Sequence, residues 1–198
     1  MNENYKKNRR TLIIIFALSI IPFAFAWYLA ATVSWSGKST NKGQLITPAV
    51  PTARNEFKGF DDFSTKNIKE IRGHWILINV LTDKECSEVC QQAIHKTKQL
   101  RLMMSKELTR IRRLVLIFSE VDKERATQWW KDDLRLLRII PAPSLIEKLI
   151  TIRKADIPEG MLFLMDPLGN LMMQYEQDFD PYDVKSDLKK LLRISQIG

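Results

Sequence analysis

The chain has 198 residues, of which 45% are hydrophobic, with seven glycines and eight prolines, a composition that excludes a disordered or fibrous protein. Its net charge of +8 is concentrated near the N-terminus, since residues 1–42 carry six basic residues against one acidic residue. The remainder carries 25 basic and 22 acidic residues, too small an excess for a nucleic-acid-binding surface, so we expect no nucleic-acid partner.

A long apolar segment follows the first basic residues. No charged side chain stands between Thr11 and Gly37, and the 22 residues 12–33 are strongly apolar. As a helix they would extend about 33 Å, enough to cross the hydrocarbon core of a membrane. Trp27, Tyr28 and Trp35 fall where amphipathic rings settle at a membrane interface. The sequence therefore predicts a single transmembrane anchor over residues 11–33.

The charges before the anchor predict its orientation. By the positive-inside rule, residues 1–10 lie in the cytoplasm and the rest of the chain on the other side, because the basic cluster comprises Lys6, Lys7, Arg9 and Arg10. Ala24-Phe25-Ala26 also resembles a signal-peptidase site, but the apolar stretch exceeds a usual signal peptide and favours an uncleaved anchor. No Arg- and Ser-rich amphipathic presequence, which would indicate a mitochondrial membrane, precedes it. We therefore expect a bacterial inner membrane and a periplasmic C-terminal domain.

The rest of the chain divides into a linker or lead-in over residues 34–57, rich in Ser, Thr, Asn, Gly and Pro, and a globular domain over residues 58–198. Predicted strands and helices alternate in this domain. In chain order they are a buried strand at 75–81, a helix at about 87–104, a strand at 113–118, helices at about 122–138 and 143–153, a hairpin of 161–165 and 171–175 around a type I turn, and an amphipathic helix at 181–194. This order predicts an α/β, thioredoxin-like sandwich, with a central mixed sheet flanked by helices.

Two cysteines, Cys86 and Cys90, stand after the first buried strand and open the next predicted helix. Residues four apart share a helix face, so both sulfurs are expected to point the same way. The free N–H groups and the dipole at a helix start stabilise a thiolate. The pair is therefore a candidate catalytic dithiol, and a candidate ligand pair for a soft ion such as Cu(I).

Two other interpretations of the pair are a structural disulfide and two buried thiols that pack as small hydrophobic groups. A disulfide across three intervening residues closes a small loop and constrains the unfolded chain little. A redox or copper role is therefore favoured over a structural one.

Other candidate ligands are sparse. His95 is nine residues beyond Cys86, on the opposite face of the predicted helix, and is interpreted as a surface residue. His74 is interpreted as a capping or surface residue. One tryptophan of the pair Trp129 and Trp130 is expected in the core. A basic stretch is interpreted as a solvated helix face, less commonly a patch for an acidic partner or anionic headgroups; it comprises Lys96, Lys98, Arg101, Lys106, Arg110, Arg112 and Arg113.

The order of strand, Cys-x-x-x-Cys and helix, followed by LFLMDPLG at residues 162–169 and a closing amphipathic helix, resembles the SCO family over about residues 70–198. These are membrane-anchored, thioredoxin-like proteins of cytochrome c oxidase assembly, and the chain is similar to the divergent SCO-like membrane proteins found beside cytochrome oxidase genes in proteobacteria. The resemblance implies a redox-active or copper-binding pair at Cys86 and Cys90, and a protein client in respiratory oxidase assembly.

Two positions depart from the SCO pattern. Ser87 replaces a proline next to the first cysteine, and Pro158, counted back from Gly169, replaces a copper-ligating histidine before the hairpin. A proline cannot ligate copper, so the resemblance leaves Cys86 and Cys90 as the remaining ligands. Thioredoxins place a proline near this position, facing their dithiol, so Pro158 favours thiol exchange.

The sequence thus predicts a protein on the periplasmic face of the membrane that acts through Cys86 and Cys90, by thiol–disulfide exchange, transient Cu(I) handling or both. A general periplasmic thiol–disulfide oxidoreductase and a non-catalytic, membrane-tethered interaction domain are the alternatives. Which cysteine attacks stays open, although Cys86, nearer the helix start, is expected to be the better exposed.

Overall fold

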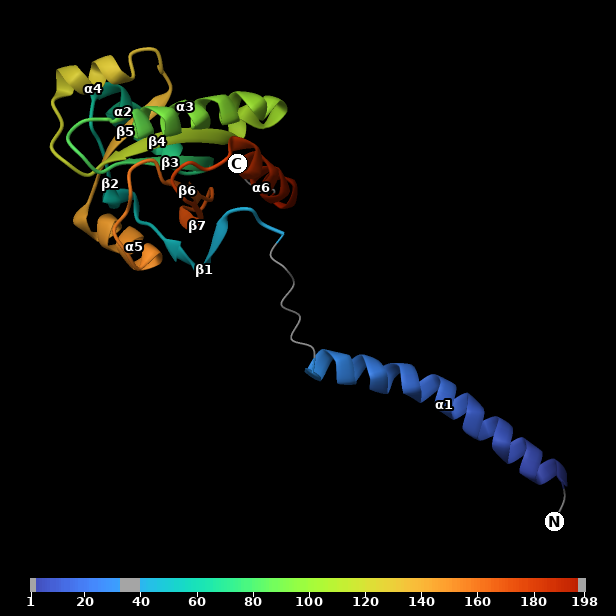
Figure 1. The fold of residues 1–198 in the computed structure, drawn as a ribbon. Coiled ribbons are helices and arrows are strands. Elements are labelled where there is room, and N and C mark those ends of the chain that lie inside the picture. The colour runs from blue at the N-terminus through green and yellow to red at the C-terminus, as the bar shows by residue number, and fades with distance from the viewer. Residues whose placement is uncertain (1–2, 33–39, 196–198) are drawn as a thin grey trace. The chain divides into compact units, whose positions relative to one another are not determined.

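The structure is a computed structural model that describes residues 3–32 and 40–195, in two compact units, 1–40 and 41–198. The first unit contains α1 (Glu3–Thr32; Figure 1). Within it, residues 8–29 have a mean hydropathy of 2.4 and none is buried, so the helix is long and apolar enough to cross a membrane, a test that a signal sequence also passes. Val33, Trp35 and the start of the predicted linker lie outside the described residues.

The second unit is built on a mixed seven-stranded sheet in the order β1-β7-β6-β3-β4-β5-β2. The central strands β3, β4 and β5 are parallel, and β6, β7, β1 and β2 are added antiparallel. The strands are β1 (Gln44–Pro51), β2 (Phe57–Gly59), β3 (Trp75–Leu81), β4 (Ile111–Ile117), β5 (Leu136–Pro141), β6 (Leu162–Met165) and β7 (Asn170–Tyr175).

Helices cover both faces of this sheet (Figure 1). The helices are α2 (Asp62–Asn67), α3 (Glu88–Met103), α4 (Lys123–Trp129), α5 (Pro143–Arg153) and α6 (Pro181–Ile194), with short 3-10 turns η1 (Arg54–Glu56), η2 (Ile68–Ile71) and η3 (Ser105–Arg110). Alternate residues of β3 face opposite sides: Ile76 and Ile78 pack in the cluster with α5, whereas Leu77 packs in the cluster with α3 and α6. Both faces of β3 are therefore buried, which explains its continuous apolar sequence.

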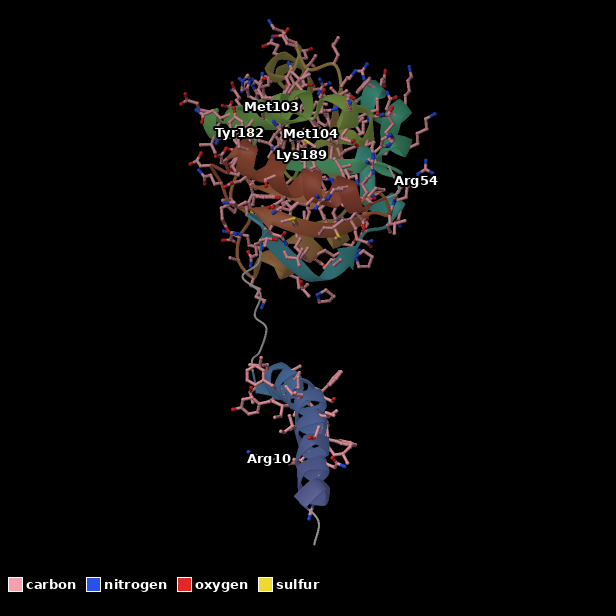
Figure 2. The ribbon with its side chains drawn as sticks, turned by 90° about the vertical axis from the view of Figure 1, so that its right-hand side faces the viewer. Arg10, Arg54, Met103, Met104, Tyr182 and Lys189 are labelled. Carbon is pink, nitrogen blue, oxygen red and sulfur yellow. A yellow bond between two sulfur atoms is a disulfide. The ribbon has the colours of Figure 1, made fainter. Side chains whose placement is uncertain are left out.

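The helices α3 and α6 lie side by side on one face of the sheet. Met104, labelled in Figure 2 just beyond the end of α3, packs in one apolar cluster with Leu188 and Leu192 of α6. Val184 belongs to the same cluster and Leu191 packs against it, so the apolar face predicted for residues 181–194 is the buried face of α6.

The prediction of a helix over 122–138 is wrong in its second half. The helix ends at Trp129, and residues 136–141 form β5, an inner strand between β4 and β2. Leu136, Leu137 and Ile139 are buried there, while the guanidinium of Arg138 donates to Asp61. Long-range pairing therefore overrides the local helical pattern.

Residues 44–59 supply the two edge strands, which the sequence did not reveal as strands. β1 pairs with β7 and β2 pairs with β5. By contrast, the predicted hairpin forms: β6 and β7 are antiparallel, and the Gly169 N–H donates to the Asp166 carbonyl at 2.9 Å. Gly169 has φ +91°, and a Cβ atom there would collide with the Arg72 guanidinium, so the turn requires glycine.

Candidate dithiol–disulfide site

Cys86 and Cys90 form a disulfide at the N-terminal end of α3, with their Cα atoms 5.2 Å apart. The helix begins at Glu88 with Ser87 as its N-cap, so Cys86 precedes the helix and Cys90 lies in its first turn. The sequence placed both cysteines on one helix face; the structure instead brings the sulfurs together through the extended backbone of Ser87 (φ −61°, ψ 176°).

Ser87 fixes this turn. Its hydroxyl oxygen accepts the Cys90 N–H at 3.4 Å, and its carbonyl accepts the Gln91 N–H at 3.0 Å. The Gln91 side-chain amide in turn donates to the Cys86 carbonyl at 3.1 Å. A serine satisfies the free N–H groups at a helix start, which gives a physical role to the residue that replaces the proline of the SCO pattern.

The disulfide is shielded from solvent. Cys86 is 5% exposed and Cys90 is 1% exposed. Both pack in the apolar cluster with Ile94 and with Trp130, the tryptophan that is buried as expected. Cys86 is the more accessible of the two, in line with the expectation from sequence.

The loop between α5 and β6 lies beside this turn. The Ser87 hydroxyl donates to a carboxylate oxygen of Glu159, and the other carboxylate oxygen is buried without a hydrogen-bond partner in the described part of the chain. Gly160 has φ +83°, and a Cβ there would lie 2.6 Å from a methyl group of Val89 in α3, so glycine permits the close approach. Pro158, which the count back from Gly169 places at the position of the SCO histidine, is therefore in the segment that contacts the cysteine turn.

Sequence reasoning missed Glu159. Nothing in the pattern around it distinguishes it from a surface acid, and its only signal is its position next to Pro158. The contact with Ser87 depends on how the loop folds back onto α3, which is a property of the tertiary structure.

The histidines do not complete a metal site. His95 is exposed, and the ring of His74 lies 3.1 Å from the Glu70 carbonyl and 3.2 Å from the Arg72 carbonyl, a local backbone contact. Among the residues that the structure describes, no three His, Cys, Asp or Glu side chains gather closely enough to hold a metal ion. The residues present therefore do not fit the three-ligand copper site of the SCO pattern.

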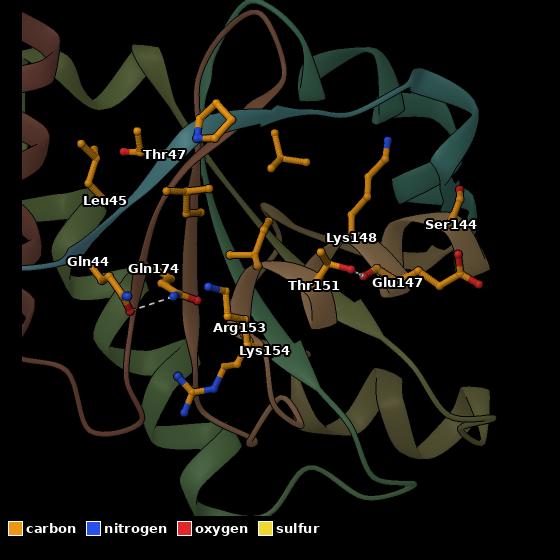
Figure 3. Close-up of a pocket in the computed structure, with 14 residues that line it drawn as sticks. Gln44, Leu45, Thr47, Ser144, Glu147, Lys148, Thr151, Arg153, Lys154 and Gln174 are labelled. Carbon is orange, nitrogen blue, oxygen red and sulfur yellow. Dashed lines mark hydrogen bonds between the residues drawn. The ribbon is translucent and has the colours of Figure 1, made fainter.

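Two hollows of about 660 Å³ lie elsewhere on the domain. One lies between β1 and α5, where the Gln174 amide donates to Gln44 at 2.8 Å and Lys148 and Arg153 form part of the wall (Figure 3). The other runs along α3 past His95. Neither of these two hollows is lined by a cysteine.

Comparison with known proteins agrees with this fold. Residues 75–195 match the family described as "Transmembrane-like, thioredoxin-like, C-terminal domain". The chain is similar to apo Sco1 from Thermus thermophilus (15% identity, covering 78% of this chain and 99% of that one, TM-score 0.56). It is also similar to copper-bound ScoI from Arabidopsis thaliana (12% identity, covering 64% of this chain and 89% of that one, TM-score 0.50). Copper-bound yeast Sco1 is similar as well (12% identity, covering 64% of this chain and 80% of that one, TM-score 0.50). No curated protein matches this sequence.

At these identities the likeness to solved structures shows the fold alone, and it confirms the predicted SCO-like, thioredoxin-like architecture. The family match covers the sheet from β3 onward, the cysteine turn and α6. The chain therefore belongs to the family of transmembrane-like, thioredoxin-like C-terminal domains.

Proposed function

We propose that this chain is a membrane-anchored thiol–disulfide exchange protein of the periplasmic face, which acts on a protein client in cytochrome c oxidase assembly. The observation that carries the proposal is the Cys86–Cys90 disulfide, which joins the residue before an N-cap to the first turn of a helix. The oxidase client is inferred from the SCO resemblance. The proposed organisation is a cytoplasmic segment 1–10, an anchor 11–33, a linker from residue 34 and a thioredoxin-like domain after it.

The exchange follows from the geometry. A client thiolate attacks the sulfur of Cys86, the more exposed cysteine, forming a mixed disulfide and releasing Cys90 as a thiolate. Cys90 lies in the first turn of α3, where the helix dipole stabilises a negative charge on the leaving sulfur. A second client thiolate then attacks the client sulfur of the mixed disulfide. The client gains a disulfide, and this chain retains both electrons as the Cys86 and Cys90 dithiol.

A structural role explains the bond less well. A disulfide with a sequence separation of four removes little entropy from the unfolded chain. The domain already has three apolar clusters, two of which contain no cysteine. The bond is therefore better suited to being made and broken than to holding the fold together.

Copper handling is a second candidate, supported by the copper-bound state of the Arabidopsis and yeast relatives. In this chain the reduced thiolates of Cys86 and Cys90 are the proposed ligands, and a third ligand would have to come from a partner. Because the described residues supply no third ligand, we place thiol exchange first.

The experiment is a redox titration of the full chain in an uncharged detergent, followed by alkylation and mass spectrometry. We expect one intramolecular disulfide that mild dithiols reduce in the native protein. In Cys90→Ser the Cys86 thiolate should attack the disulfide of the oxidised client, the reverse of the exchange above, and accumulate a mixed disulfide because Cys90 is missing to resolve it. Cys86→Ser is the matched control that should trap much less. Thiols that are released and alkylate only after unfolding would contradict the proposal and favour a non-catalytic interaction domain.

The client separates the two redox alternatives. Trapping of an oxidase subunit by Cys90→Ser would support a dedicated assembly role, as would a gene neighbourhood that contains oxidase genes. Trapping of many unrelated periplasmic proteins would instead identify a general oxidoreductase.

A further inference from the structure

The basic stretch interpreted from sequence as a solvated helix face is not one surface. Arg113 lies buried in β4, with its Nη1 2.7 Å from Asp133, and Arg112 donates to Glu70. These side chains are held by acids of neighbouring elements. One member of the stretch, Arg101, is buried and forms no ion pair with an acidic side chain of the described residues 40–195.

Arg101 lies in the last turn of α3 and is 8% exposed. Its Nε–H donates to the Ile111 carbonyl at 2.9 Å. Its two terminal nitrogens have no hydrogen-bond partner in residues 40–195, and the side chain lines a hollow of about 400 Å³. A guanidinium presents its donors as a planar fork, so these nitrogens are free to hold two oxygens of one ligand.

The charge around Arg101 favours an anion. Burial and the charges of Arg112, Arg135 and Arg113 lower the pKa of Arg101 below its usual value, although the charge of Asp133 acts in the opposite direction. Because an arginine remains protonated in proteins, the local excess of positive charge persists at every working pH. Arg135 and Lys98 also line the hollow, and the ammonium group of Lys98 donates to the Asp132 carbonyl at 3.0 Å. Asp132 and Asp133 line it as well, and Asp133 is paired with Arg113, so basic side chains outnumber acidic ones in the lining.

Apolar side chains border the same hollow. Leu102 is 54% exposed and Leu134 is 78% exposed, although both are large hydrophobic residues. Exposed leucines beside basic side chains are typical of a surface that enters the headgroup region of an anionic bilayer. The chain also carries, in α1, a helix with the composition to enter a membrane, so lipid headgroups are a ligand it would meet.

We propose that the hollow between the end of α3 and residues 132–135 binds the phosphate group of an anionic phospholipid. Arg101 holds two phosphate oxygens, Arg135 and Lys98 add positive charge, and Leu102 and Leu134 contact the acyl region. The site shares no residue with the cysteine turn, so this proposal is independent of thiol exchange.

The test uses the full chain in lipid nanodiscs of phosphatidylcholine, with or without phosphatidylglycerol, and hydrogen–deuterium exchange as the readout. We expect exchange in residues 98–103 and 132–136 to slow by about fivefold or more with phosphatidylglycerol, in line with the attraction of one basic residue to an anionic surface. Inorganic phosphate added to phosphatidylcholine discs distinguishes a lipid site from a site for free phosphate.

Arg135→Gln and Arg101→Lys should each remove most of the protection. Arg54→Gln is the matched control, because Arg54 is an exposed arginine of η1 outside the hollow (Figure 2), and it should leave the protection unchanged. Equal exchange in the two kinds of disc would overturn the proposal. So would full protection by inorganic phosphate alone, or protection that appears only with an acidic protein partner.

Discussion

The Ser87 hydroxyl donates a hydrogen bond to the carboxylate of Glu159, 72 residues further along the chain. The same hydroxyl oxygen accepts the Cys90 N–H, so Glu159 lies two hydrogen bonds from one of the cysteines. A negative charge is therefore held beside a disulfide whose reduction creates a second negative charge on sulfur. The two charges repel each other, which favours the oxidised form.

Replacing that charge should make the disulfide easier to reduce. For Glu159→Gln we expect the reduction potential to rise by about 20 mV or more, since two like charges about 4 Å apart repel by about 1 kcal/mol even in bulk water, which equals about 20 mV for a two-electron couple. The measurement is a glutathione redox titration of the full chain in detergent. Glu147→Gln, which removes an exposed acid of α5, should leave the potential unchanged. An unchanged potential in Glu159→Gln would mean that the carboxylate does not act on the sulfurs.

The elements that the sequence predicts best are those with strong local patterns. The run at 75–81 is β3 with the same bounds, and the amphipathic segment 181–194 is α6. The strands β1 and β2 were missed because they are edge strands, held by pairing with β7 and β5 rather than by their own composition. The strand β5 was taken for helix for the same reason: its neighbours in space, not in sequence, determine its conformation.

The candidate site shows the same limit. Spacing identifies Cys86 and Cys90 as a pair, because both lie in one short segment. It cannot identify Glu159, which comes from a loop that reaches the cysteine turn only in the folded domain. Likewise, the sequence groups Arg101 with its basic neighbours, whereas only the structure separates it from Arg113, which is paired with Asp133.

Reduction should leave the domain folded. The disulfide closes a loop with a sequence separation of four. Constraining so short a loop in the unfolded chain adds about 2 kcal/mol at most to the free energy of unfolding. We expect the thermal midpoint of the full chain in detergent to fall by no more than about 8 °C on reduction, measured by circular dichroism. The double variant Cys86→Ser, Cys90→Ser should match the reduced protein and show no response to reductant. Loss of cooperative unfolding on reduction would identify the bond as structural.

Glu56 should make stability depend on acidic pH. Burial alone would raise the pKa of Glu56, but the hydrogen bonds from Lys148, the Ala53 N–H and Ser144 together lower it by more. The folded pKa therefore lies below the usual value of 4.5. The associated stability is present above the unfolded pKa and is lost as the pH falls through the folded pKa. We expect the unfolding free energy to decline below about pH 4.5, and Glu56→Gln to flatten that decline. A decline equally steep in Glu56→Gln would assign it to other carboxylates; Glu147→Gln is the control.

Orientation can be tested with reporters. A periplasm-dependent phosphatase fused after residue 198 should be active, because the basic residues before the apolar helix favour a cytoplasmic N-terminus. Removing this charge cluster should reduce the active fraction; the residues to replace by asparagine are Lys6, Lys7, Arg9 and Arg10. Mass spectrometry should find an unprocessed N-terminus. Mature protein that begins near Trp27 would show that the segment is a cleaved signal peptide.

We expect the affinity of the reduced protein for Cu(I) to depend on the segment that carries Pro158. Contacts of Glu159 with Ser87, and the close approach of Gly160 to Val89, hold this segment against the cysteine turn. The chain has a proline where the SCO pattern has a histidine, so we expect the reduced protein to bind Cu(I) only through its two thiolates, more weakly than a full three-ligand site.

Pro158→His should then tighten Cu(I) binding, by about tenfold or more, because it restores an imidazole beside the dithiol. The measurement is a competition titration against a Cu(I) chelator under reducing conditions, with the full chain in detergent. Asp156→His is the matched control, because it adds an imidazole to an exposed position of the same loop, and it should change the affinity little. Cys90→Ser should abolish tight binding in every background. Tight wild-type binding that survives Cys90→Ser would mean that copper binds elsewhere, and an unchanged affinity in Pro158→His would mean that Pro158 does not occupy the ligand position.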